Sequence, residues 1–416
     1  MATAQSEYLA GERGWRPNLL FAAVTFGVLS GYLAGLMMML VGRTWILTPS
    51  GKPVPCDFLA YWASGLMALS GHAASAYDPN AQHAAQILAA GPMPGYFYWN
   101  YPPLFFFVAV VLASAPYLAA FLGWVIATGA AYAVTIGAIA RRWEAVLAAC
   151  ASPVILLTAF GGQNGFLSAA LLGGALLVLR EQPIISGILL GLMTYKPQFG
   201  ILVPVALICG GHWRALLWAA VTASLAIGLS TLAFGIGAYV SFFHFLPVVS
   251  HASLTLGGEG WNKMQSIYAI ARVLGAGDGL AWFAQALTMI ACAAAMIWLW
   301  RGNVAYELKA AGLVLASMLS TPYLHVYDFP VLIVALALLY RHRPFDRVDW
   351  FAVAAINVLL LEFVAQLAPI GPGILMLAGA LILRRMRWKA VCSPANTLRD
   401  TFRRNLPKAE ADPLRL

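Results

Sequence analysis

Apolar residues run through the chain in blocks that are separated by short polar or basic turns. A helix needs about 20 apolar residues to cross a membrane, and shorter apolar helices are tolerated where protein surrounds them. The pattern therefore predicts an all-α polytopic membrane protein with about twelve transmembrane helices. The apolar blocks lie at residues 19–41, 103–114, 117–140, 145–160, 165–179, 184–195, 198–210, 213–235, 279–300, 305–320, 328–340, 350–367 and 371–386.

Basic residues gather in alternate turns of this pattern and thereby orient the predicted helices. Membrane proteins keep an excess of Lys and Arg in their cytoplasmic turns. We therefore expect the segment 1–18 and the basic tail 389–416 to be cytoplasmic in a bacterial inner membrane, with one transmembrane domain at 19–388. The polar start shows no small-residue cleavage pattern, so the block 19–41 is expected to be a retained first span. The basic turns contain Arg141, Arg142, Arg180, Arg214, Arg301, Arg341, Arg343, Arg347 and the run from Arg384 to Lys389.

Two long loops are expected on the opposite, periplasmic side, at about 42–102 and 236–266. Loops of this length are uncommon unless they have a function. The first contains amphipathic stretches at 57–79 and 81–91 and ends in the aromatic sequence GYFYWNYPP. We expect helices that lie in the membrane interface there, where Trp and Tyr are enriched. Alternation between the two sides also requires that one of the two apolar blocks within 103–140 is re-entrant or interfacial.

The composition excludes other classes of protein. Hydrophobic residues make up 61% of the chain and charged residues only 10%, whereas soluble proteins contain about 25% charged residues. The net charge of +9 is concentrated in turns and in the tail, so it indicates topology and not a nucleic-acid partner. The five cysteines show no CxxC spacing, and no metal-ligand spacing is present. We expect no metal, no cofactor and a monomer in the lipid bilayer.

Asp57 is the first candidate for chemistry. It lies in the stretch PVPCDFLAYWASG, shortly after the first apolar block. A carboxylate at the mouth of a membrane cavity can act as a general base toward a hydroxyl group. The alternative is structural, because an Asp before an amphipathic helix is a good N-cap. Tyr61, one helical turn later, is expected to frame this acid within the substrate groove.

Lys196, His325 and Asp328 are candidates for binding an anion. Lys196 precedes Pro197, where an apolar helix is expected to end, and a lysine near a free helix end suits a lipid phosphate. Alternatively, Lys196 extends to the lipid headgroups. His325 and Asp328 are three positions apart and share a face if the segment is helical. A histidine there can contact a phosphate, or it can be an interfacial residue with satisfied hydrogen bonds.

Several amide side chains lie on the same predicted side and complete the candidate set. Polar groups at membrane depth are costly and are therefore candidates for function. The sequence GGQNG is also typical of an ordinary tight turn between helices, so that alternative stays open. Together these groups suit a lipid-phosphate substrate whose polar head enters from the periplasmic side. The amides are Gln163 and Asn164 in GGQNG, Gln198 in TYKPQ, and Asn262 and Gln265 in GWNKMQS.

Six segments, in order over most of the chain, resemble glycosyltransferase family 87. They are CDFLAYWASGLMALSGHAASAYDP, YPPLFFF, GGQNGFLSAALLGGALL, GILLGLMTYKPQFGILVPVAL, NKMQSIYA and STPYLHVYD. This family has the GT-C membrane fold and includes mycobacterial mannosyltransferases that depend on polyprenyl-phosphate-mannose. The resemblance implies a GT-C-type bundle and the inverting transfer of a hexose from a polyprenyl-phosphate sugar. The acceptor would be a hydroxyl group of a glycolipid, a glycan or a protein on the periplasmic side.

The resemblance also implies roles for individual residues. A carboxylate early in the first external loop is the expected general base, and Asp57 matches that position. The basic and His positions near the donor phosphate match Lys196 and His325. Gln163 and the segment 262–266 match family motifs whose roles are not assigned. One departure is the lack of a second acidic residue beside Asp57, which argues against dependence on a metal.

Two other functions fit parts of the pattern. A transporter or flippase for lipid-linked sugars predicts charged residues near the bilayer centre and repeated halves. The sequence shows no repeat, and its polar groups gather on one side. An O-antigen polymerase or ligase would need paired arginines in a large outer loop, and 236–266 contains no arginine. The sequence therefore favours the glycosyltransferase.

Overall fold

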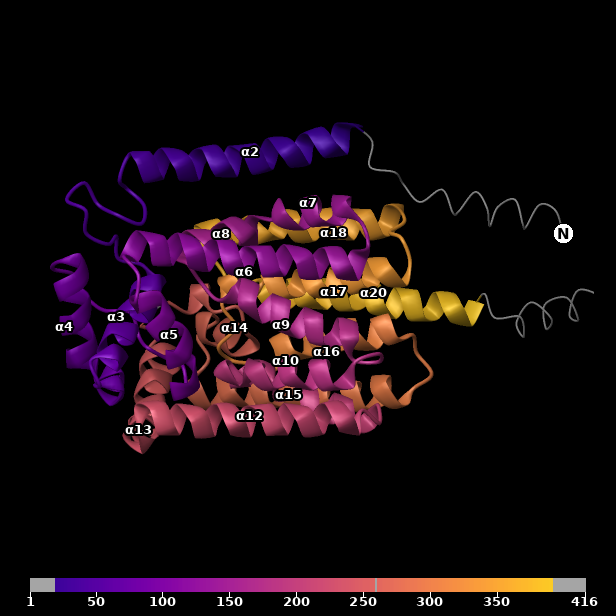
Figure 1. The fold of residues 1–416 in the computed structure, drawn as a ribbon. Helices are drawn as coiled ribbons and strands as arrows, with labels where there is room; N and C mark the ends of the chain where they lie inside the picture. The colour runs from indigo at the N-terminus through magenta and orange to yellow at the C-terminus, as the bar shows by residue number, and fades with distance from the viewer. Residues whose placement is uncertain (1–18, 259, 392–416) are drawn as a thin grey trace, which may run out of the picture.

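The computed structural model describes residues 19–258 and 260–391, and most of its helices run side by side (Figure 1). Within these ranges the backbone forms no sheet, only two isolated antiparallel bridges, Leu47 with Pro53 and Met264 with His325. The prediction of an all-α membrane protein is confirmed. The predicted segment 1–18 and nearly all of the predicted tail 389–416 lie outside the described residues.

Five helical stretches are long and apolar enough to cross a membrane. The bent pair of α7 (Trp143–Cys150) and α8 (Pro153–Gly161) would make a sixth span. Helix length therefore supports five or six crossings in the described part of the chain, and the count of about twelve stays a prediction. The five stretches are α2 (Leu19–Val41, of which Ala23–Val41 qualifies), α6 (Tyr117–Ala140), α12 (Trp213–Phe234), α15 (Asp278–Arg301) and Arg347–Ala365, which comprises α18 (Arg347–Leu360) and α19 (Glu362–Ala365).

The apolar block at 145–160 forms two helices and not one. α7 and α8 meet at an angle of 64°. Pro153 is the first residue of α8, where its missing N–H breaks no helical hydrogen bond. The residue before a proline avoids helical backbone angles, and Ser152 is accordingly extended, with φ −64° and ψ 138°. The proline therefore fixes the position of the bend.

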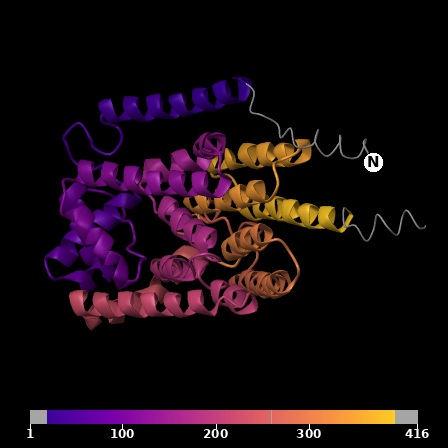
Figure 2. The same cartoon turned by 45° about the vertical axis from the view of Figure 1, so that its right-hand side comes forward.

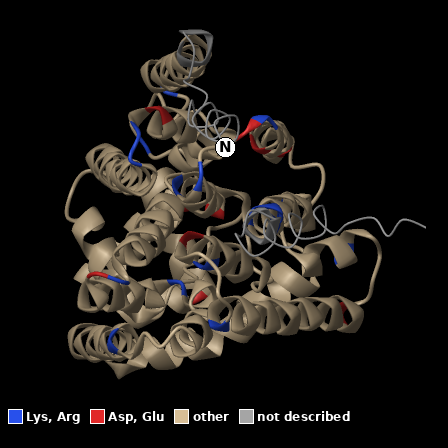
Figure 3. Cartoon of the chain, turned by 90° about the vertical axis from the view of Figure 1, so that its right-hand side faces the viewer, with Lys and Arg blue, Asp and Glu red and all other residues tan. Residues whose placement is uncertain are grey.

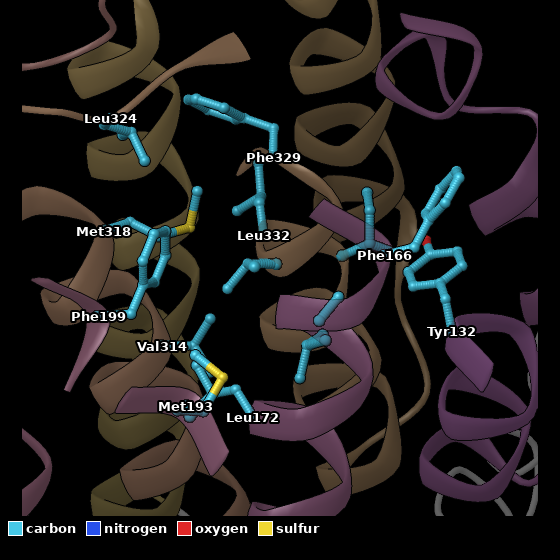
Figure 4. Close-up of a cluster of buried hydrophobic side chains, with 14 of the residues drawn as sticks. Tyr132, Phe166, Leu172, Met193, Phe199, Val314, Met318, Leu324, Phe329 and Leu332 are labelled. Carbon is cyan, nitrogen blue, oxygen red and sulfur yellow. The ribbon is translucent and has the colours of Figure 1, made fainter. Parts of the chain in front are cut away.

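The remaining helices of the bundle, apart from α20 with its 21 residues, are shorter, and several are enclosed by protein. α16 and α17 are buried along most of their length. Leu172, Val314 and Leu332, from three different helices, belong to one buried cluster that Figure 4 shows. Because neighbouring helices cover these segments, they need not match the thickness of the bilayer. They are α9 (Gly165–Val178), α10 (Pro183–Leu192), α11 (Val203–Cys209), α16 (Tyr306–Leu319), α17 (Pro330–His342) and α20 (Gly371–Val391).

Two glycines let α10 and α12 approach each other closely. Gly187 and Gly191 have the spacing of a GxxxG motif. A Cβ atom at Gly187 would lie 2.6 Å from the carbonyl oxygen of Ala215, and one at Gly191 would lie 2.7 Å from the carbonyl oxygen of Ala219. Such spacing is typical of membrane helix pairs, whose association depends on close van der Waals contact.

One end of the bundle, which we call the loop end, carries the first long loop (Figures 1 and 2). Each of the two amphipathic stretches of this loop contains a helix, and the expected place of these helices in the membrane interface stays a prediction. The first of them, α3, is not a surface helix: Phe58 and Tyr61 are buried, and Gly65 packs against the backbone of Ala109 in α5 (Phe106–Ala113). This loop is therefore part of the protein core. Its elements are α3 (Asp57–Leu69), the 3-10 turn η1 (Ala73–Tyr77) and α4 (Pro79–Ala90).

The block 103–114 is the short member of the pair within 103–140. It forms the 3-10 turn η2 (Pro103–Phe105) and α5 (Phe106–Ala113), whereas α6 is long enough to cross a membrane. The expectation that one of these two blocks is not a full span therefore agrees with the helix lengths.

The structure differs from the prediction of a long loop at 236–266. This segment begins with α13 (Ile236–Ser250), a helix of 15 residues at the loop end. Pro247 lies inside α13, and its missing N–H weakens the helix. The backbone loosens into the π turn η5 (His251–Thr255) directly afterwards. η6 (Trp261–Lys263) and α14 (Ile267–Val273) follow.

The opposite end of the bundle, which we call the basic end, gathers basic turns of the sequence (Figure 3). Arg341, near the end of α17, donates to the carbonyl oxygens of Ala138 and Ile139 near the end of α6. Arg385 of α20 forms a buried ion pair with Asp349 of α18. Arg385 also donates to the carbonyl oxygen of Leu339 in α17 and so links the two pairs of helices, whose basic turns therefore share one end.

The contact between α10 and α12 can be tested with a matched pair of glycine substitutions. Gly191→Ala places a methyl group against the side chain of Thr222 and the carbonyl oxygen of Ala219 in α12, and it is expected to destabilise the protein by about 1–3 kcal/mol. Gly123→Ala is the control, because a Cβ atom there would have no atom within 4 Å. We expect a lower apparent melting temperature in detergent for Gly191→Ala alone. Equal melting temperatures for the two variants would contradict the close approach.

Candidate active site

Asp57 is the first residue of α3, at the loop end. The N-cap position is occupied by Cys56, whose side chain makes no capping hydrogen bond, so Asp57 is not the N-cap of the alternative interpretation. Its half-buried carboxylate lies near the turn after α8. A Cβ atom at Gly161 would lie 3.7 Å from Oδ2 of Asp57 and 3.4 Å from Cγ of Gln163. A negative charge in the first turn of a helix is also stabilised by the helix dipole.

Glycines shape the turn 161–165, which joins α8 to α9. Gly162 adopts a left-handed backbone conformation, with φ 62°. Gly165 lies against the segment that precedes α17, since a Cβ atom there would be only 1.9 Å from the carbonyl oxygen of Tyr327. A side chain at Gly162 would strain the backbone of the turn, and one at Gly165 would push the turn away from Tyr327. The sequence GGQNG therefore holds its two amide side chains in place.

A chain of hydrogen bonds leads from Gln163 into the interior. Tyr61 Oη donates to Gln163 Oε1 at 3.0 Å, and the hydroxyl groups of Tyr61 and Tyr101 lie 2.9 Å apart. Because the hydroxyl hydrogen of Tyr61 is used on Gln163, Tyr101 must donate to Tyr61. Asn164 Nδ2 donates to Tyr101 Oη at 2.7 Å, and Lys196 Nζ donates to Asn164 Oδ1 at 3.0 Å. These hydrogen bonds thus connect Gln163, which lies near the start of α3, to the buried Lys196.

The hydrogen-bond chain ends in an ion pair between Lys196 and Asp328. These side chains are only 5% and 0% exposed. Lys196 Nζ donates to Asp328 Oδ1 as well as to Asn164, and it lies 5.3 Å from the ring centroid of Tyr327 and 5.4 Å from that of Phe199. Lys196 therefore does not extend to the lipid headgroups. A buried charge of this kind is tolerated because an opposite charge and hydrogen bonds compensate it.

His325 belongs to the same turn as Asp328. Its backbone N–H donates to Asp328 Oδ2 at 3.1 Å, and its half-buried ring stacks on the ring of Tyr327 with centroids 5.1 Å apart. Nδ1 lies 3.1 Å from the carbonyl oxygen of Tyr323, and because a carbonyl only accepts, Nδ1 carries a proton. The turn is the 3-10 element η7 (Val326–Asp328), so His325 and Asp328 meet through a capping contact instead of a shared helix face.

Gln265 joins three segments of the chain. Its backbone N–H donates to the carbonyl oxygen of Leu324 at 2.6 Å. Its side chain is fully buried, accepts from the N–H of Gly371 at 2.8 Å and donates to the carbonyl oxygen of Asn262 at 2.8 Å. Gln265 thus fixes the segment that precedes His325. The predicted substrate contacts of Asn262, Gln265 and the half-buried Gln198 stay predictions.

Tyr101 is the site residue that the sequence did not single out. Burial raises the pKa of Tyr101 above its ordinary value, and the charges of Asp328 and Asp57 raise it further. Tyr101 is therefore neutral at physiological pH and lies within electrostatic reach of both carboxylates. The available signal was its place in WNYPP, where two prolines fix the chain just before an apolar helix.

The two carboxylates of this cluster belong to residues that differ in burial. Asp328 is fully buried and paired with Lys196, so protonating it would break an ion pair. Asp57 is half-buried and lies beside the turn that holds Gln163. Asp57 is therefore the carboxylate that is suited to accept a proton from a substrate hydroxyl, whereas Asp328 is suited to hold Lys196 in place.

The fold and the site together define an integral membrane protein with a buried polar cluster at one end of a helical bundle. The chain belongs to glycosyltransferase family 87, whose family model matches residues 99–322. It is thus a membrane glycosyltransferase, which speaks against the transporter and flippase alternatives. No match was found among curated proteins or among solved structures. The matched range contains Tyr101, Gln163, Asn164, Lys196, Gln198, Asn262 and Gln265, and lies between Asp57 and Tyr61 on one side and His325 and Asp328 on the other.

The ion pair can be tested by comparing a single with a double substitution. Lys196→Met leaves the buried Asp328 without its cation and is expected to cost about 3–5 kcal/mol of stability. Adding Asp328→Asn removes the uncompensated charge, so the double variant is expected to melt at a higher temperature than the single one. Thermal unfolding in one detergent measures both. A single variant as stable as the unchanged protein would contradict the pair.

Proposed function

We propose that this protein is an inverting hexosyltransferase that transfers a sugar, with mannose as the first candidate, from a polyprenyl-phosphate donor to a hydroxyl group. The acceptor is a glycolipid, a glycan or a protein. Family membership supports the transferase class. A membrane bundle with its polar cluster at one end supports a donor whose head reaches that end while its hydrocarbon tail stays among the helices.

The position of Asp57 is the observation that carries this proposal. In the proposed step, Asp57 removes the proton of the acceptor hydroxyl as the hydroxyl oxygen attacks the anomeric carbon. The bond from that carbon to the phosphate oxygen breaks, and polyprenyl phosphate leaves with the bonding electrons. Attack from the side opposite the phosphate inverts the configuration. Asp57 is a half-buried residue at the start of α3, and this partial exposure supports a role in which it meets an acceptor and acts as a base.

Lys196 and His325 are proposed to contact the donor phosphate. Two N–H groups of the Lys196 ammonium point to Asn164 and Asp328. An ammonium has three such groups, and we assign the third to a phosphate oxygen. The half-buried ring of His325 lies in the same turn as Asp328 and would supply a second contact. In this assignment Asp328 holds Lys196 in place. Hydrogen bonds through Tyr101 and Tyr61 connect Asn164, the other partner of Lys196, to Gln163.

We further propose the orientation and architecture of the protein in its membrane. The basic end would face the cytoplasm, because positive charges are retained there. The loop end, with Asp57, would then face the periplasm of a bacterial inner membrane. The bundle would be of the GT-C type, with its short central helices completing about twelve crossings. The protein would act as a monomer and without a metal.

The role of Asp57 is tested against a second carboxylate of the same loop. Asp57→Asn is expected to lower the transfer rate by about 10²–10⁴-fold, because a positioned base is lost. Asp78→Asn is the control: Asp78 is exposed and caps α4 through the N–H of Ala81 at 2.8 Å, and Asn caps a helix equally well. Both variants are introduced into a deletion strain, and its envelope glycolipids and glycans are compared by mass spectrometry. Restoration of the hexose-bearing products by Asp57→Asn would contradict the assignment.

The donor class is tested with isolated membranes and two labelled mannose donors. Transfer is expected from polyprenyl-phosphate-mannose and not from a nucleotide-linked mannose, and it is expected to persist in the presence of EDTA. Transfer from the nucleotide sugar in membranes that cannot make the lipid-linked form would contradict the proposed donor. Loss of transfer in EDTA that Mg²⁺ or Mn²⁺ restores would contradict the metal-independent reaction.

A further inference from the structure

A polar cavity lies at the basic end, away from the cluster around Asp57. Its volume is about 680 Å³, and it is formed by the turns that join α9 to α10, α11 to α12 and α15 to α16. Such a volume is typical of sites for small molecules or headgroups. Three cationic side chains, Arg180, Arg301 and Lys309, line the cavity together with His212, and none of its lining residues is acidic.

Uncharged groups hold two of these cations in place. Lys309 Nζ donates to the carbonyl oxygen of Trp300 at 3.0 Å, and the guanidinium of Arg180 lies 5.6 Å from the ring centroid of Tyr306. Tyr306 is itself anchored, since its hydroxyl group donates to the carbonyl oxygen of Leu176. These contacts position the charges without neutralising them, so the cavity keeps a positive potential that favours an anion.

The surroundings of His212 reflect this positive potential. Burial lowers the pKa of His212, and the charges of Arg180 and Lys309 lower it further. The nearest acidic residues along the chain do not offset these cations. Glu307 Oε2 lies 3.9 Å from His342 Nδ1, and Glu181 is exposed. Neither residue lines the cavity.

Exposed tryptophans place the cavity at the level of the lipid headgroups. Trp213 begins α12 and is 60% exposed, and Trp298 lies in the last turn of α15 and is 58% exposed. Tryptophan is enriched at the boundary between hydrocarbon and water. α12 and α15 are also among the helices that are long enough to span the membrane. We therefore expect the cations of the cavity at the depth of the phospholipid phosphate groups.

We propose that this cavity binds the phosphate group of an anionic phospholipid in the leaflet at the basic end. Basic pockets between the ends of membrane helices are suited to such headgroups. A free phosphate ion offers the same oxygen atoms, but the flanking tryptophans and apolar helix ends favour the lipid. The site lies at the opposite end of the bundle from the proposed transfer reaction and does not depend on it.

The test measures lipid binding to the full-length protein after its native lipids have been removed in detergent. Native mass spectrometry follows titrations with phosphatidylglycerol, with zwitterionic phosphatidylcholine and with inorganic phosphate. Phosphatidylglycerol is expected to bind more tightly than phosphatidylcholine. The variant Arg180→Gln with Arg301→Gln is expected to weaken phosphatidylglycerol binding by about tenfold or more, because two exposed cations are lost.

The control variant removes two positive charges elsewhere at the same end. Arg141→Gln with Arg142→Gln changes two exposed residues just before α7, which line a separate pocket together with the acidic Glu144 of α7, and it is expected to leave phosphatidylglycerol binding within about twofold. Gel filtration and thermal unfolding check that both variants fold, and single substitutions at Arg180 and Arg301 replace the double variant if it does not.

Equal weakening by the two double variants would overturn the proposal, because binding would then follow the total charge and not this cavity. Equal affinity for the two lipids would overturn it as well. If inorganic phosphate binds and requires Arg180 and Arg301 while phosphatidylglycerol does not bind, the phosphate chemistry of the site is supported and the lipid source is overturned.

Discussion

The cost of burying a charge is the constraint on which the candidate active site depends. Lys196 and Asp328 are both withdrawn from solvent, and each is acceptable there only because the other is present. Their pairing fixes the end of the α10 segment against the turn before α17. Asn164, Tyr101 and Tyr61 then follow in a single hydrogen-bonded order. The half-buried Asp57, beyond the end of this chain, is thus the carboxylate that is suited to chemistry.

Close backbone contacts give this polar cluster its precision. Gly165 brings the start of α9 against the carbonyl of Tyr327, and Gly161 leaves room for the carboxylate of Asp57. Gln265 ties the segment before His325 to the start of α20. Side chains on such rigid connections lose little conformational freedom when a substrate binds. The loop end therefore combines buried turns, which are rigid, with a half-buried acid at their edge.

Much of the fold could be predicted from the sequence, because a membrane constrains both the length of the apolar segments and the side on which basic turns lie. The bounds of α2, α6, α9 and α12 follow the apolar blocks to within one residue at either end. The block at 145–160 shows the limit: its hydrophobicity is continuous, and Pro153 sets the bend. α13 was missed because its polar and aromatic residues and Pro247 resemble a loop, although tertiary packing keeps the segment helical.

The candidate site was predicted less completely than the fold. Asp57, Lys196, His325 and Asp328 stand out because a charge in an apolar sequence is conspicuous. Nothing in the spacing of Lys196 and Asp328 reveals that they contact each other. Tyr101 was missed because a tyrosine in an aromatic loop is indistinguishable from an interfacial one until its hydrogen-bond partners are known. The sequence thus indicates which groups are unusual, and only the fold shows which of them compensate one another.

The separation of Lys196 and Asp328 along the chain has a consequence for how the protein is made. The two residues are 132 positions apart, and the helices α11 to α16 all lie between them. When the α10 segment first leaves the ribosome, its lysine has no carboxylate to pair with. During synthesis, this segment is therefore expected to remain at the membrane surface, with its lysine in water. It would settle into the bundle only once the turn before α17 has been made and supplies Asp328.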